Sequence, residues 1–429
     1  MITRAITPLA GPPDATVVVP GSKSFTNRAL ITAALASGRS TLRGVLFSDD
    51  TEAMLSCLQS LRIPTIVDRQ NVLVAVDGCG GTLPTAAASV NVRQSGTTAR
   101  FVAPMLALGR GRYEIDGDAQ MRARPMGDLV KALNDLGVRV EGSGNVDRLP
   151  LTVMADGVRG GGISVPGDVS SQFLSGLLLS APCFVNGLTV RVVGDLVSKP
   201  YVDMTLATMA AFGARIDRDA YQSFAVAPGG YRSADYVIEP DASAASYFFG
   251  AAVIMGGRIR IEGLGTGALQ GDVAFVDILE SMGATVTRTA SAIEVDARSL
   301  PPGGLRGVEV DMAHCSDTAQ TLAAVAVFAN SPTKVTGIGF IRRKETDRIN
   351  AVVTELRRCG IGAREDADGF TIFPGAPQPT TFATYDDHRM AMSFSLLGLK
   401  VPGMAVENPG CVAKTFPRFF DVLETLRRG

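Results

Sequence analysis

The stretch Pro20–Leu35 reads P-G-S-K-S-F-T-N-R-A-L-I-T-A-A-L, a polar loop that leads into a run of small apolar residues. Similar loops return roughly every seventy residues, each ahead of an apolar run of the same kind. They begin at Pro20, Arg93, Pro166, Pro240, His314 and Tyr385. A fixed period of this length is typical of a repeat architecture, in which loops far apart in sequence occupy equivalent positions.

A second, amphipathic helix is expected in every repeat. Its copies begin at Asp49, Gly127, Val202, Gly271, Thr346 and Phe416. Apolar residues recur in them at helical spacing, and most copies end at a glycine, which permits a left-handed stop. The first helix differs, because Thr321–Ala329, for example, is apolar on every side and should be buried. Each repeat therefore predicts roughly β-α-β-α-β-β, with one buried helix and one surface helix.

The length of 429 residues predicts two domains, since single hydrophobic cores stop growing near ~250–300 residues. Six repeats divide into three and three, with the boundary near Pro240, where the fourth begins. Residues 1–20 precede the first repeat and could pair with the last one. The predicted domains are therefore 21–240, and 1–20 together with 241–429.

Composition argues against several classes of protein. The net charge of −1 disfavours nucleic acid or an anionic membrane as the main partner. The apolar run around Ala323–Ala329 is too short to span a bilayer, and no long apolar segment follows Met1 that would indicate a secretory signal. Six cysteines without a C-x-x-C pair indicate a reducing, cytoplasmic setting, and only two histidines occur. We therefore expect neither a metal site nor a cofactor.

Charged and polar residues gather in the loops that precede the helices. The cations are Lys23, Arg28, Arg100, Arg124, Lys199, Lys344, Arg348, Arg389 and Lys414, and the acids are Asp317, Glu345 and Asp387. Each motif alone has a plainer explanation, since Ser170–Gln172 could be a helix cap and Arg342–Arg348 a solvated face. Their shared place in the repeat predicts a composite site for a small polyanion. The motif G-x-x-x-x-G-K-[ST] is absent, which argues against phosphoryl transfer from ATP.

Eight motifs, in chain order, extend this interpretation. They are P-G-S-K-S-F-T-N-R-A-L, S-G-T-T-A-R, R-A-R-P, S-S-Q-F-L-S, S-K-P-Y-V-D-M-T-L, K-E-T-D-R, D-D-H-R-M-A-M and A-K-T-F-P. Together they resemble the 5-enolpyruvylshikimate-3-phosphate synthase family over essentially the full length. The resemblance implies an α/β fold, a two-domain inside-out α/β barrel of six β-α-β-α-β-β units, three per domain, that closes over its substrates.

The resemblance also implies an activity in the shikimate pathway of aromatic amino acid biosynthesis. The enolpyruvyl group of phosphoenolpyruvate would pass to the 5-hydroxyl of shikimate 3-phosphate, with release of inorganic phosphate through a tetrahedral intermediate. The partners would be these two small anionic substrates, with glyphosate as an inhibitor. The enzyme would be a cytoplasmic monomer that binds neither nucleic acid nor a membrane.

Residue roles follow from the same resemblance. The shikimate 3-phosphate contacts would be Lys23, Ser24, Arg28, Ser170, Ser171, Gln172, Ser198, Tyr201, Asp317 and Lys344. The phosphoenolpyruvate contacts would be Lys23, Gly96, Arg124, Gln172, Arg348, Arg389 and Lys414. Asp317 would accept the proton of the substrate hydroxyl, and Glu345 would protonate the enol carbon with help from Lys23.

Three positions depart from the family pattern, and three other readings compete with it. Phe340 stands where several members have an Asn that contacts substrate, Phe101 where Pro is common, and Ser95 where Ala is usual. The sibling transferase acting on UDP-N-acetylglucosamine would carry a reactive Cys near Arg122–Pro125, which is lacking. An RNA-terminal phosphate cyclase would need a basic RNA-binding face. A non-catalytic scaffold would leave the concentration of charge in equivalent loops unexplained.

Overall fold

Two units make up the chain, and each is built from three α/β repeats. Unit 1 comprises Met1–Pro20 with Glu239–Gly429, and unit 2 comprises Gly21–Ile238. The computed structural model describes residues 2–142, 144, 146–168 and 170–427. Among the described helices, none is long and apolar enough to cross a membrane.

The second, third and fifth repeats show the β-α-β-α-β-β pattern in full. The second contains β6 (Ala87–Asn91), α3 (Gly96–Leu106), β7 (Arg110–Asp116), α5 (Gly127–Asp135), β8 (Arg139–Gly142) and β9 (Leu151–Asp156). The third contains β10 (Gly161–Pro166), α6 (Ser171–Ser180), β11 (Leu188–Val193), α7 (Lys199–Ala211), β12 (Ile216–Asp219) and β13 (Ser223–Val226). The fifth contains β19 (Glu309–Asp311), α10 (Ala319–Ala326), β20 (Thr333–Thr336), α11 (Arg348–Arg358), β21 (Gly362–Asp366) and β22 (Gly369–Phe373). In each sheet the first two strands are parallel and the last two form an antiparallel hairpin, in the order first, second, fourth, third.

The first and fourth repeats take their first strand from a distant part of the chain. The first repeat contains α1 (Lys23–Leu35), β3 (Ala36–Arg43), α2 (Asp49–Ser60), β4 (Thr65–Asp68) and β5 (Leu73–Cys79). Its β3 pairs in parallel with β14 (Tyr231–Arg232) and β15 (Asp235–Val237), at the end of unit 2. The fourth repeat contains α8 (Ala242–Met255), β16 (Arg258–Glu262), α9 (Phe275–Ser281), β17 (Thr285–Arg288) and β18 (Ala292–Asp296). Its β16 pairs in parallel with β2 (Asp14–Val17).

The sixth repeat is completed by the start of the chain. It contains β23 (Thr381–Phe382), α12 (His388–Gly398), β24 (Ala405–Glu407) and α13 (Phe419–Thr425). The strand β1 (Thr3–Ala5) pairs antiparallel with β24. The expectation that residues 1–20 pair with the last repeat is therefore right for β1 and wrong for β2, which joins the fourth repeat.

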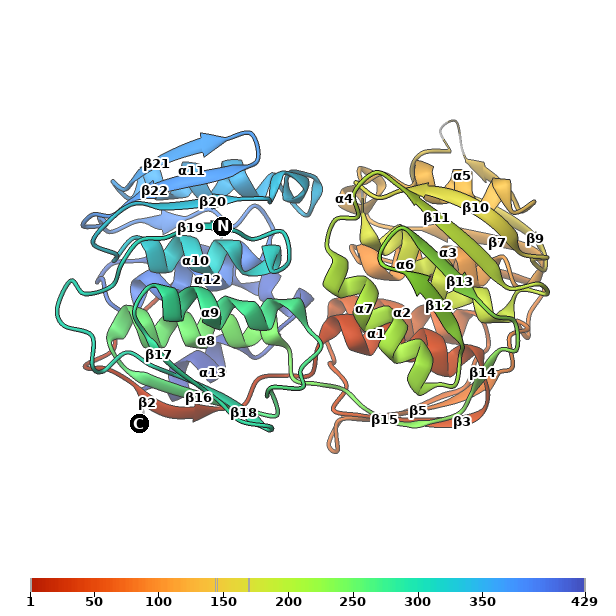
Figure 1. Cartoon of the computed structure of the whole chain (residues 1–429), viewed down its shortest axis with the longest axis horizontal. Coiled ribbons are helices and arrows are strands. Elements are labelled where there is room, and N and C mark those ends of the chain that lie inside the picture. The colour runs from red at the N-terminus through yellow and green to blue at the C-terminus, as the bar shows by residue number, and fades with distance from the viewer. Residues whose placement is uncertain (1, 143, 145, 169, 428–429) are drawn as a thin grey trace. The chain divides into compact units, whose positions relative to one another are not determined.

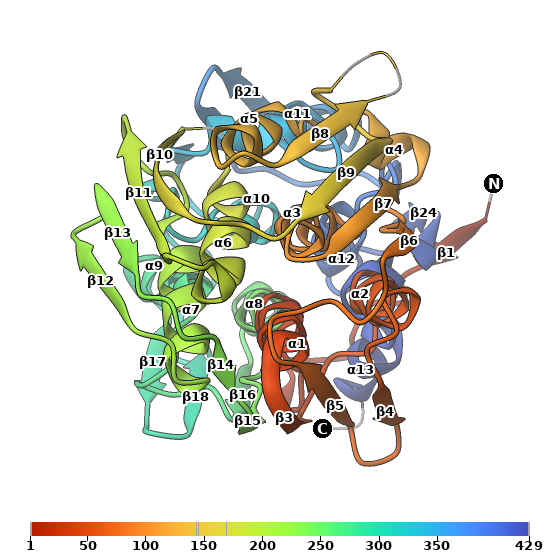
Figure 2. The same ribbon diagram turned by 90° about the vertical axis from the view of Figure 1, so that its right-hand side faces the viewer.

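The first helix of every repeat lies inside, with the sheets outside. Helices α1, α3 and α6 pack on one another in unit 2, surrounded by its strands (Figure 2). In unit 1, α8, α10 and α12 lie between the sheet of β16–β18 and the sheet of β20–β22 (Figure 1). Small residues allow this close packing, since a Cβ on Gly176 of α6 would lie 2.1 Å from the carbonyl oxygen of Arg100 in α3. The inside-out α/β architecture is thereby confirmed.

The second helices α5 and α11 are amphipathic as the sequence predicts, whereas α7 is not clearly so. Most of the second helices are followed by a glycine, as expected. Gly137, Gly213, Gly283 and Gly360 follow α5, α7, α9 and α11, with φ of +84°, +85°, +117° and +82°. These are left-handed conformations in which glycine carries no Cβ penalty. The helix α2 is followed instead by Arg62, at φ +59°. The buried helix predicted over Thr321–Ala329 extends too far. In the structure α10 ends at Ala326, and Phe328 beyond it is half-buried.

Candidate active site

Arg348, the first residue of α11, holds three carboxylates together in unit 1. Its Nε donates to Asp387 Oδ2 (2.8 Å), its Nη1 to Asp317 Oδ1 (3.1 Å) and its Nη2 to Glu345 Oε2 (2.8 Å). The Arg348 side chain is 2% exposed. Burial alone would lower the pKa of Arg348, yet the carboxylates of Asp387, Glu345 and Asp317 raise it above its ordinary value. The guanidinium is therefore a permanent cation around which the acids are arranged.

Two further cations border the same acids. Arg389, near the start of α12, donates from Nη2 to Asp317 Oδ2 at 2.7 Å. Lys414, the last residue of the 3₁₀ helix η5 (Pro409–Lys414), has its Nζ 3.9 Å from Glu345 Oε1. Both side chains are buried. Each of the two acids that the resemblance assigns to proton transfer thus contacts two cations.

Helix starts place these side chains. Asp387 is the N-cap of α12 and accepts from the backbone N–H of Arg389 (2.9 Å), while Asp347 is the N-cap of α11 and accepts from that of Asn350 (3.0 Å). The helix expected from Thr346 therefore begins at Arg348. An N-terminal helix end is positively polarised, so anions are favoured at both places.

The loop before α12 is held in a strained conformation. Tyr385 and Asp386 have φ of +54° and +55°, which is uncommon for residues other than glycine. Glu355 of α11, fully buried, accepts from Tyr385 Oη (2.7 Å) and from the backbone N–H of Ala383 (3.0 Å). Asn408 Nδ2 donates to Asp386 Oδ1 at 3.0 Å. These contacts orient Asp387 toward Arg348. Nothing in the sequence indicated this role for Glu355.

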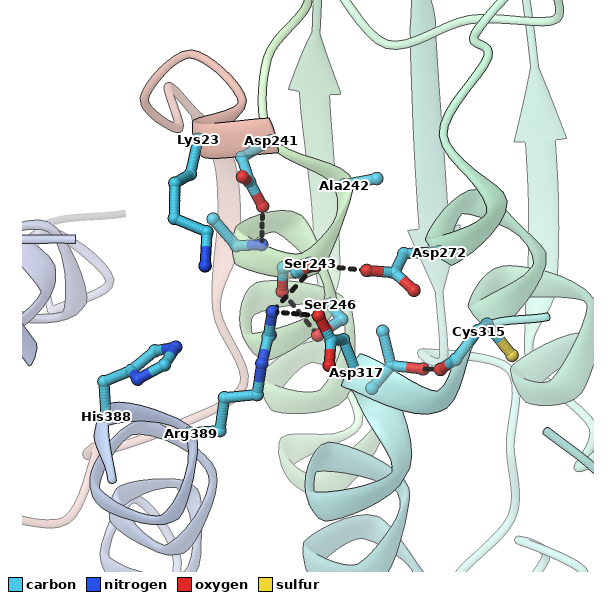
Figure 3. Close-up of polar contacts among 12 residues, drawn as sticks. Lys23, Asp241, Ala242, Ser243, Ser246, Asp272, Cys315, Asp317, His388 and Arg389 are labelled. Carbon is cyan, nitrogen blue, oxygen red and sulfur yellow. Dashed lines mark hydrogen bonds and ion pairs between the residues drawn. The ribbon is translucent and has the colours of Figure 1, made fainter. Parts of the chain in front are cut away.

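A serine and a further aspartate extend the acid cluster. The hydroxyl of Ser243 in α8 donates to Oδ2 of Asp272, in the 3₁₀ helix η2 (Gly271–Ala274). Ser243 Oγ also accepts from Arg389 Nη2 at 3.4 Å, so that Ser243 lies between Asp272 and Arg389 (Figure 3). Sequence reasoning missed both residues, although each lies at the start of a helix of the repeat, where the other polar residues gather.

In unit 2, Arg28 connects its own helix α1 to α6 and α7. Its Nε donates to Thr205 Oγ1 (2.8 Å) and its Nη2 to the carbonyl oxygen of Tyr201 (2.8 Å), both in α7. Its Nη2 also lies 3.5 Å from Ser175 Oγ of α6. Burial lowers the pKa of Arg28 to about 10. Among the residues with described positions, only neutral acceptors bond to Arg28, so its charge is available to a bound anion.

Lys23 and Ser24 open α1, next to an acid of the following helix. Lys23 Nζ lies 3.4 Å from Asp50 Oδ2, and Asp50 is a buried residue in the first turn of α2. The carbonyl oxygen of Ser24 accepts from Arg28 Nη1 at 2.9 Å. The N-cap is Ser22, whose side chain accepts from the backbone N–H of Phe25. Asp50 was absent from the predicted site.

Gly96 begins α3 beside two arginines. A Cβ built on Gly96 would lie 2.5 Å from Arg124 Nη1 and 2.7 Å from Arg100 Nη1. Arg100 donates to the carbonyl oxygens of Gly96 (3.2 Å) and Pro125 (2.8 Å), which fixes the segment between α4 (Ala119–Arg122) and α5 that carries Arg124. Ser95 caps α3 by accepting from the backbone N–H of Thr98 (3.2 Å), a physical reason for its departure from the family's usual Ala.

The remaining predicted residues are placed as follows. Ser170 caps α6 by accepting from the backbone N–H of Gln172 (3.3 Å), as the plainer interpretation of this motif proposed. Gln172 Nε2 donates to Thr97 Oγ1 of α3 at 3.4 Å, and the buried Ser171 begins α6. Ser198 precedes α7 at φ +55°, with Tyr201 in the first turn, and Lys344 lies half-buried beside Glu345. Lys199 lies over the ring of Tyr221, with its Nζ 5.4 Å from the ring centroid.

Each unit therefore contains a group of cations at the starts of helices. Carboxylates accompany them, three around Arg348 in unit 1 and Asp50 beside Lys23 in unit 2. This combination can bind phosphate and carboxylate groups and transfer protons beside them. Within the described ranges, no group of three or more His, Cys, Asp or Glu side chains could hold a metal ion.

The chain matches known proteins over almost its whole length. The family model of EPSP synthase (3-phosphoshikimate 1-carboxyvinyltransferase) matches residues 9–423. The 3-phosphoshikimate 1-carboxyvinyltransferase of Trichormus variabilis is 45% identical over 421 residues, which cover 98% of each chain. That of Nostoc punctiforme is 45% identical over 429 residues, 99% of this chain and 100% of the relative. An EPSP synthase structure from Acinetobacter baumannii is similar in fold, with a TM-score of 0.84 at 24% identity over 98% of this chain and 97% of that one.

Proposed function

The chain belongs to the EPSP synthase family, and on this premise we propose that it transfers the enolpyruvyl group of phosphoenolpyruvate to the 5-hydroxyl of shikimate 3-phosphate. Inorganic phosphate is the second product. The structural observation that carries the proposal is the cluster around Arg348, where two acids suited to proton transfer lie among buried cations. The cations of this cluster can bind anionic substrates, and its two acids can accept a proton from a substrate or donate one to it.

Unit 2 supplies most of the proposed contacts to shikimate 3-phosphate. We assign this role to Lys23, Ser24, Arg28, Ser170, Ser171, Gln172, Ser198 and Tyr201, together with Asp317 and Lys344 of unit 1. The charge of Arg28, held by neutral acceptors, supports the assignment. A buried guanidinium surrounded by neutral groups gains most from a nearby phosphate or hydroxyl oxygen.

The proposed contacts to phosphoenolpyruvate are mainly cationic. They are Lys23, Gly96, Arg124, Gln172, Arg348, Arg389 and Lys414. Arg348 and Arg389 support this role because both are buried and approach Asp317, where the reacting hydroxyl would lie. A substrate carboxylate can accept hydrogen bonds from the two guanidinium groups, as Asp317 does here.

The proposed chemistry needs two proton transfers. Glu345, assisted by Lys23, protonates C3 of the enol phosphate, and C2 becomes cationic. Asp317 takes the proton of the 5-hydroxyl, whose oxygen attacks C2 to form a tetrahedral adduct. Loss of phosphate by C–O cleavage, with proton return from C3, restores the enol ether. Arg348 and Lys414 contact Glu345, and a substrate anion would compete with Glu345 for both cations.

We further propose that the two units are the two domains of a monomeric cytoplasmic enzyme. One chain carries every residue of the proposed site, so no second copy is needed to complete it. The six cysteines are free thiols, which suits a reducing compartment. Size-exclusion chromatography with light scattering tests the monomer, and a mass of two chains would contradict it.

Phosphate release should need both substrates and neither ATP nor a thiol. Burial raises the pKa of Cys57, Cys183, Cys315 and Cys411 to about 12, which makes each a poor nucleophile at neutral pH. We expect turnover in a colorimetric phosphate assay to survive EDTA and a thiol-blocking reagent. UDP-N-acetylglucosamine in place of shikimate 3-phosphate should give no release. Release with that acceptor, or loss of activity on EDTA that zinc or magnesium restores, would contradict the proposal.

Gly96→Ala should raise the KM for phosphoenolpyruvate and leave that for shikimate 3-phosphate nearly unchanged. The new methyl group would meet the Arg124 guanidinium at 2.5 Å, and this flexible side chain has to move away from its ligand position. A displacement of this kind should raise the KM for phosphoenolpyruvate roughly 10–100-fold. The longer glyphosate should be excluded more strongly, as inhibition curves would show. Gly162→Ala is the control, because its Cβ meets nothing within 4 Å. Equal KM changes for both substrates would indicate backbone strain instead.

A further inference from the structure

Asp272 is a buried carboxyl group that the proposed mechanism does not use. It lies in η2, and the preceding Gln270 accepts from the backbone N–H of Ala242 (3.1 Å), which ties this segment to the start of α8. Asp272 is 6% exposed. Its Oδ2 accepts from the Ser243 hydroxyl, whereas no group among the described residues donates to its buried Oδ1.

Ser243 connects Asp272 to the proposed substrate contacts. Its Oγ accepts from Arg389 Nη2 (3.4 Å), and the same nitrogen donates to Asp317 Oδ2 (2.7 Å), as Figure 3 shows. Arg389 Nη1 lies 3.4 Å from Tyr247 Oη. One guanidinium therefore faces two carboxyl groups, Asp317 directly and Asp272 through a hydroxyl.

An ionised Asp272 is costly in this place. A carboxylate oxygen that is buried without a donor loses its hydration and gains nothing in return. Burial, and next the negative charge of Asp317, raise the pKa of Asp272 to about 7, although Arg389 and Ser243 act in the opposite direction. A proton on Asp272 is thus exchanged near neutral pH.

Other titratable groups face Asp272 from each element packed around it. They are Asp241 at the start of α8, Cys315 and Asp317 at the 3₁₀ helix η3 (Ser316–Thr318), and Arg389 of α12, beside which lies Tyr247 of α8. Asp277 of α9 is exposed and pairs with Arg288 instead. Burial raises the pKa of Cys315 to about 12 and moves that of Tyr247 further above its ordinary value. Both therefore stay protonated throughout the neutral range.

We propose that Asp272 is a positioning residue that takes up a proton when an anionic substrate occupies Arg389. The inference rests on the proposed function, because phosphoenolpyruvate is the anion in question. A substrate carboxylate at Arg389 would be a third negative group around one guanidinium. Asp272, the deepest and least bonded of the three, accepts a proton from the solvent and becomes neutral. Its Oδ2 still accepts from Ser243, which keeps Arg389 in place, and the proton returns to solvent when the ligand leaves.

The kinetic test compares the wild type with Asp272→Asn, which keeps an oxygen acceptor for Ser243 and cannot ionise. The KM for phosphoenolpyruvate is measured from pH 6 to pH 9 for both, and the ratio of wild type to variant cancels the ligand's own titration. One pKa unit of coupling is a factor of ten, so the ratio should rise from about 1 at pH 6 to roughly tenfold at pH 9. The KM ratio for shikimate 3-phosphate should stay flat. Asp277→Asn, an exposed aspartate of α9, is the control.

A second test needs no turnover and isolates the proton on Asp272. Because its folded pKa of about 7 exceeds the ordinary 3.8, the stability that protonation confers is present below pH 4 and is lost as pH rises to 7. As the pH rises from 4 to 7, the Tm of Asp272→Asn should therefore increase relative to that of the wild type. Above pH 7 the difference between the two Tm values should stay constant. Ser243→Ala should remove the kinetic pH dependence while keeping this thermal one.

The outcomes separate the two proposals. A flat phosphoenolpyruvate ratio, or an equal slope for shikimate 3-phosphate, would overturn the role of Asp272. A constant Tm difference from pH 4 to pH 7 would overturn its protonation. A wild type that releases no phosphate would instead overturn the proposed function, and the thermal comparison would still decide whether Asp272 exchanges a proton.

Discussion

Glu345→Gln should lower kcat by about 10²–10⁴-fold while the KM values of both substrates change far less. The amide can accept from Arg348 in the way that the carboxylate Oε2 does at 2.8 Å, so the binding cations keep their places. It cannot deliver a proton to the enol carbon. Steady-state kinetics at saturating concentrations of both substrates measure the loss.

Glu309→Gln is the matched control for this variant. Glu309 lies on β19 with its side chain 69% exposed and pairs with Lys334 at the surface, so its kcat should equal that of the wild type. Retention of kcat within a few-fold by Glu345→Gln would remove Glu345 from proton transfer. A loss of thermal stability in Glu345→Gln, measured by circular dichroism melts, would indicate instead that Glu345 contributes to the structure.

Arg348→Met should both abolish turnover and destabilise unit 1. The variant removes the cation that holds the buried Asp387 and the half-buried Asp317 and Glu345, and Asp387 is then buried without Arg348. Removal of one partner from a buried ion pair typically costs about 3–5 kcal/mol. For a domain of 150–250 residues that corresponds to a fall in Tm of roughly 2–4 °C for each kcal/mol. Thermal melts at neutral pH measure it.

Arg364→Met serves as control, since Arg364 is 60% exposed on β21 and pairs with Asp366. An exposed pair contributes about 0–1 kcal/mol, so its Tm should hardly move. A Tm of Arg348→Met equal to that of the control would mean that the acids are not held by Arg348.

The repeat architecture could be predicted because its signals are local. Helix α1 is buried from Phe25 to Leu35, as a helix that is apolar on every side should be, and Gly213 stops α7 in the left-handed conformation expected of it. The exchange of first strands could not be predicted. Both β2 and β15 are short, and each pairs with a strand more than a hundred residues away, which local periodicity does not encode.

The site was predictable as a set of residues but not as a network. Loop position and family motifs pointed to Arg348, Arg389 and Asp317, which the structure brings together in unit 1. They did not point to Glu355, because it looks like any polar residue of an amphipathic helix until Tyr385 and Ala383 are seen to donate to it.

Spacing along the chain determined by itself that this protein is a six-fold α/β repeat with polar loops at helix starts, since helix periodicity, glycine stops and loop motifs are properties of neighbouring residues. Tertiary structure alone decided which charges neutralise one another and which buried polar atoms stay unsatisfied. Burial and pairing depend on groups that meet only after folding, because they lie on different helices. Asp272 and Asp277 are five positions apart in one segment; one is buried behind Ser243 and the other forms a surface pair with Arg288.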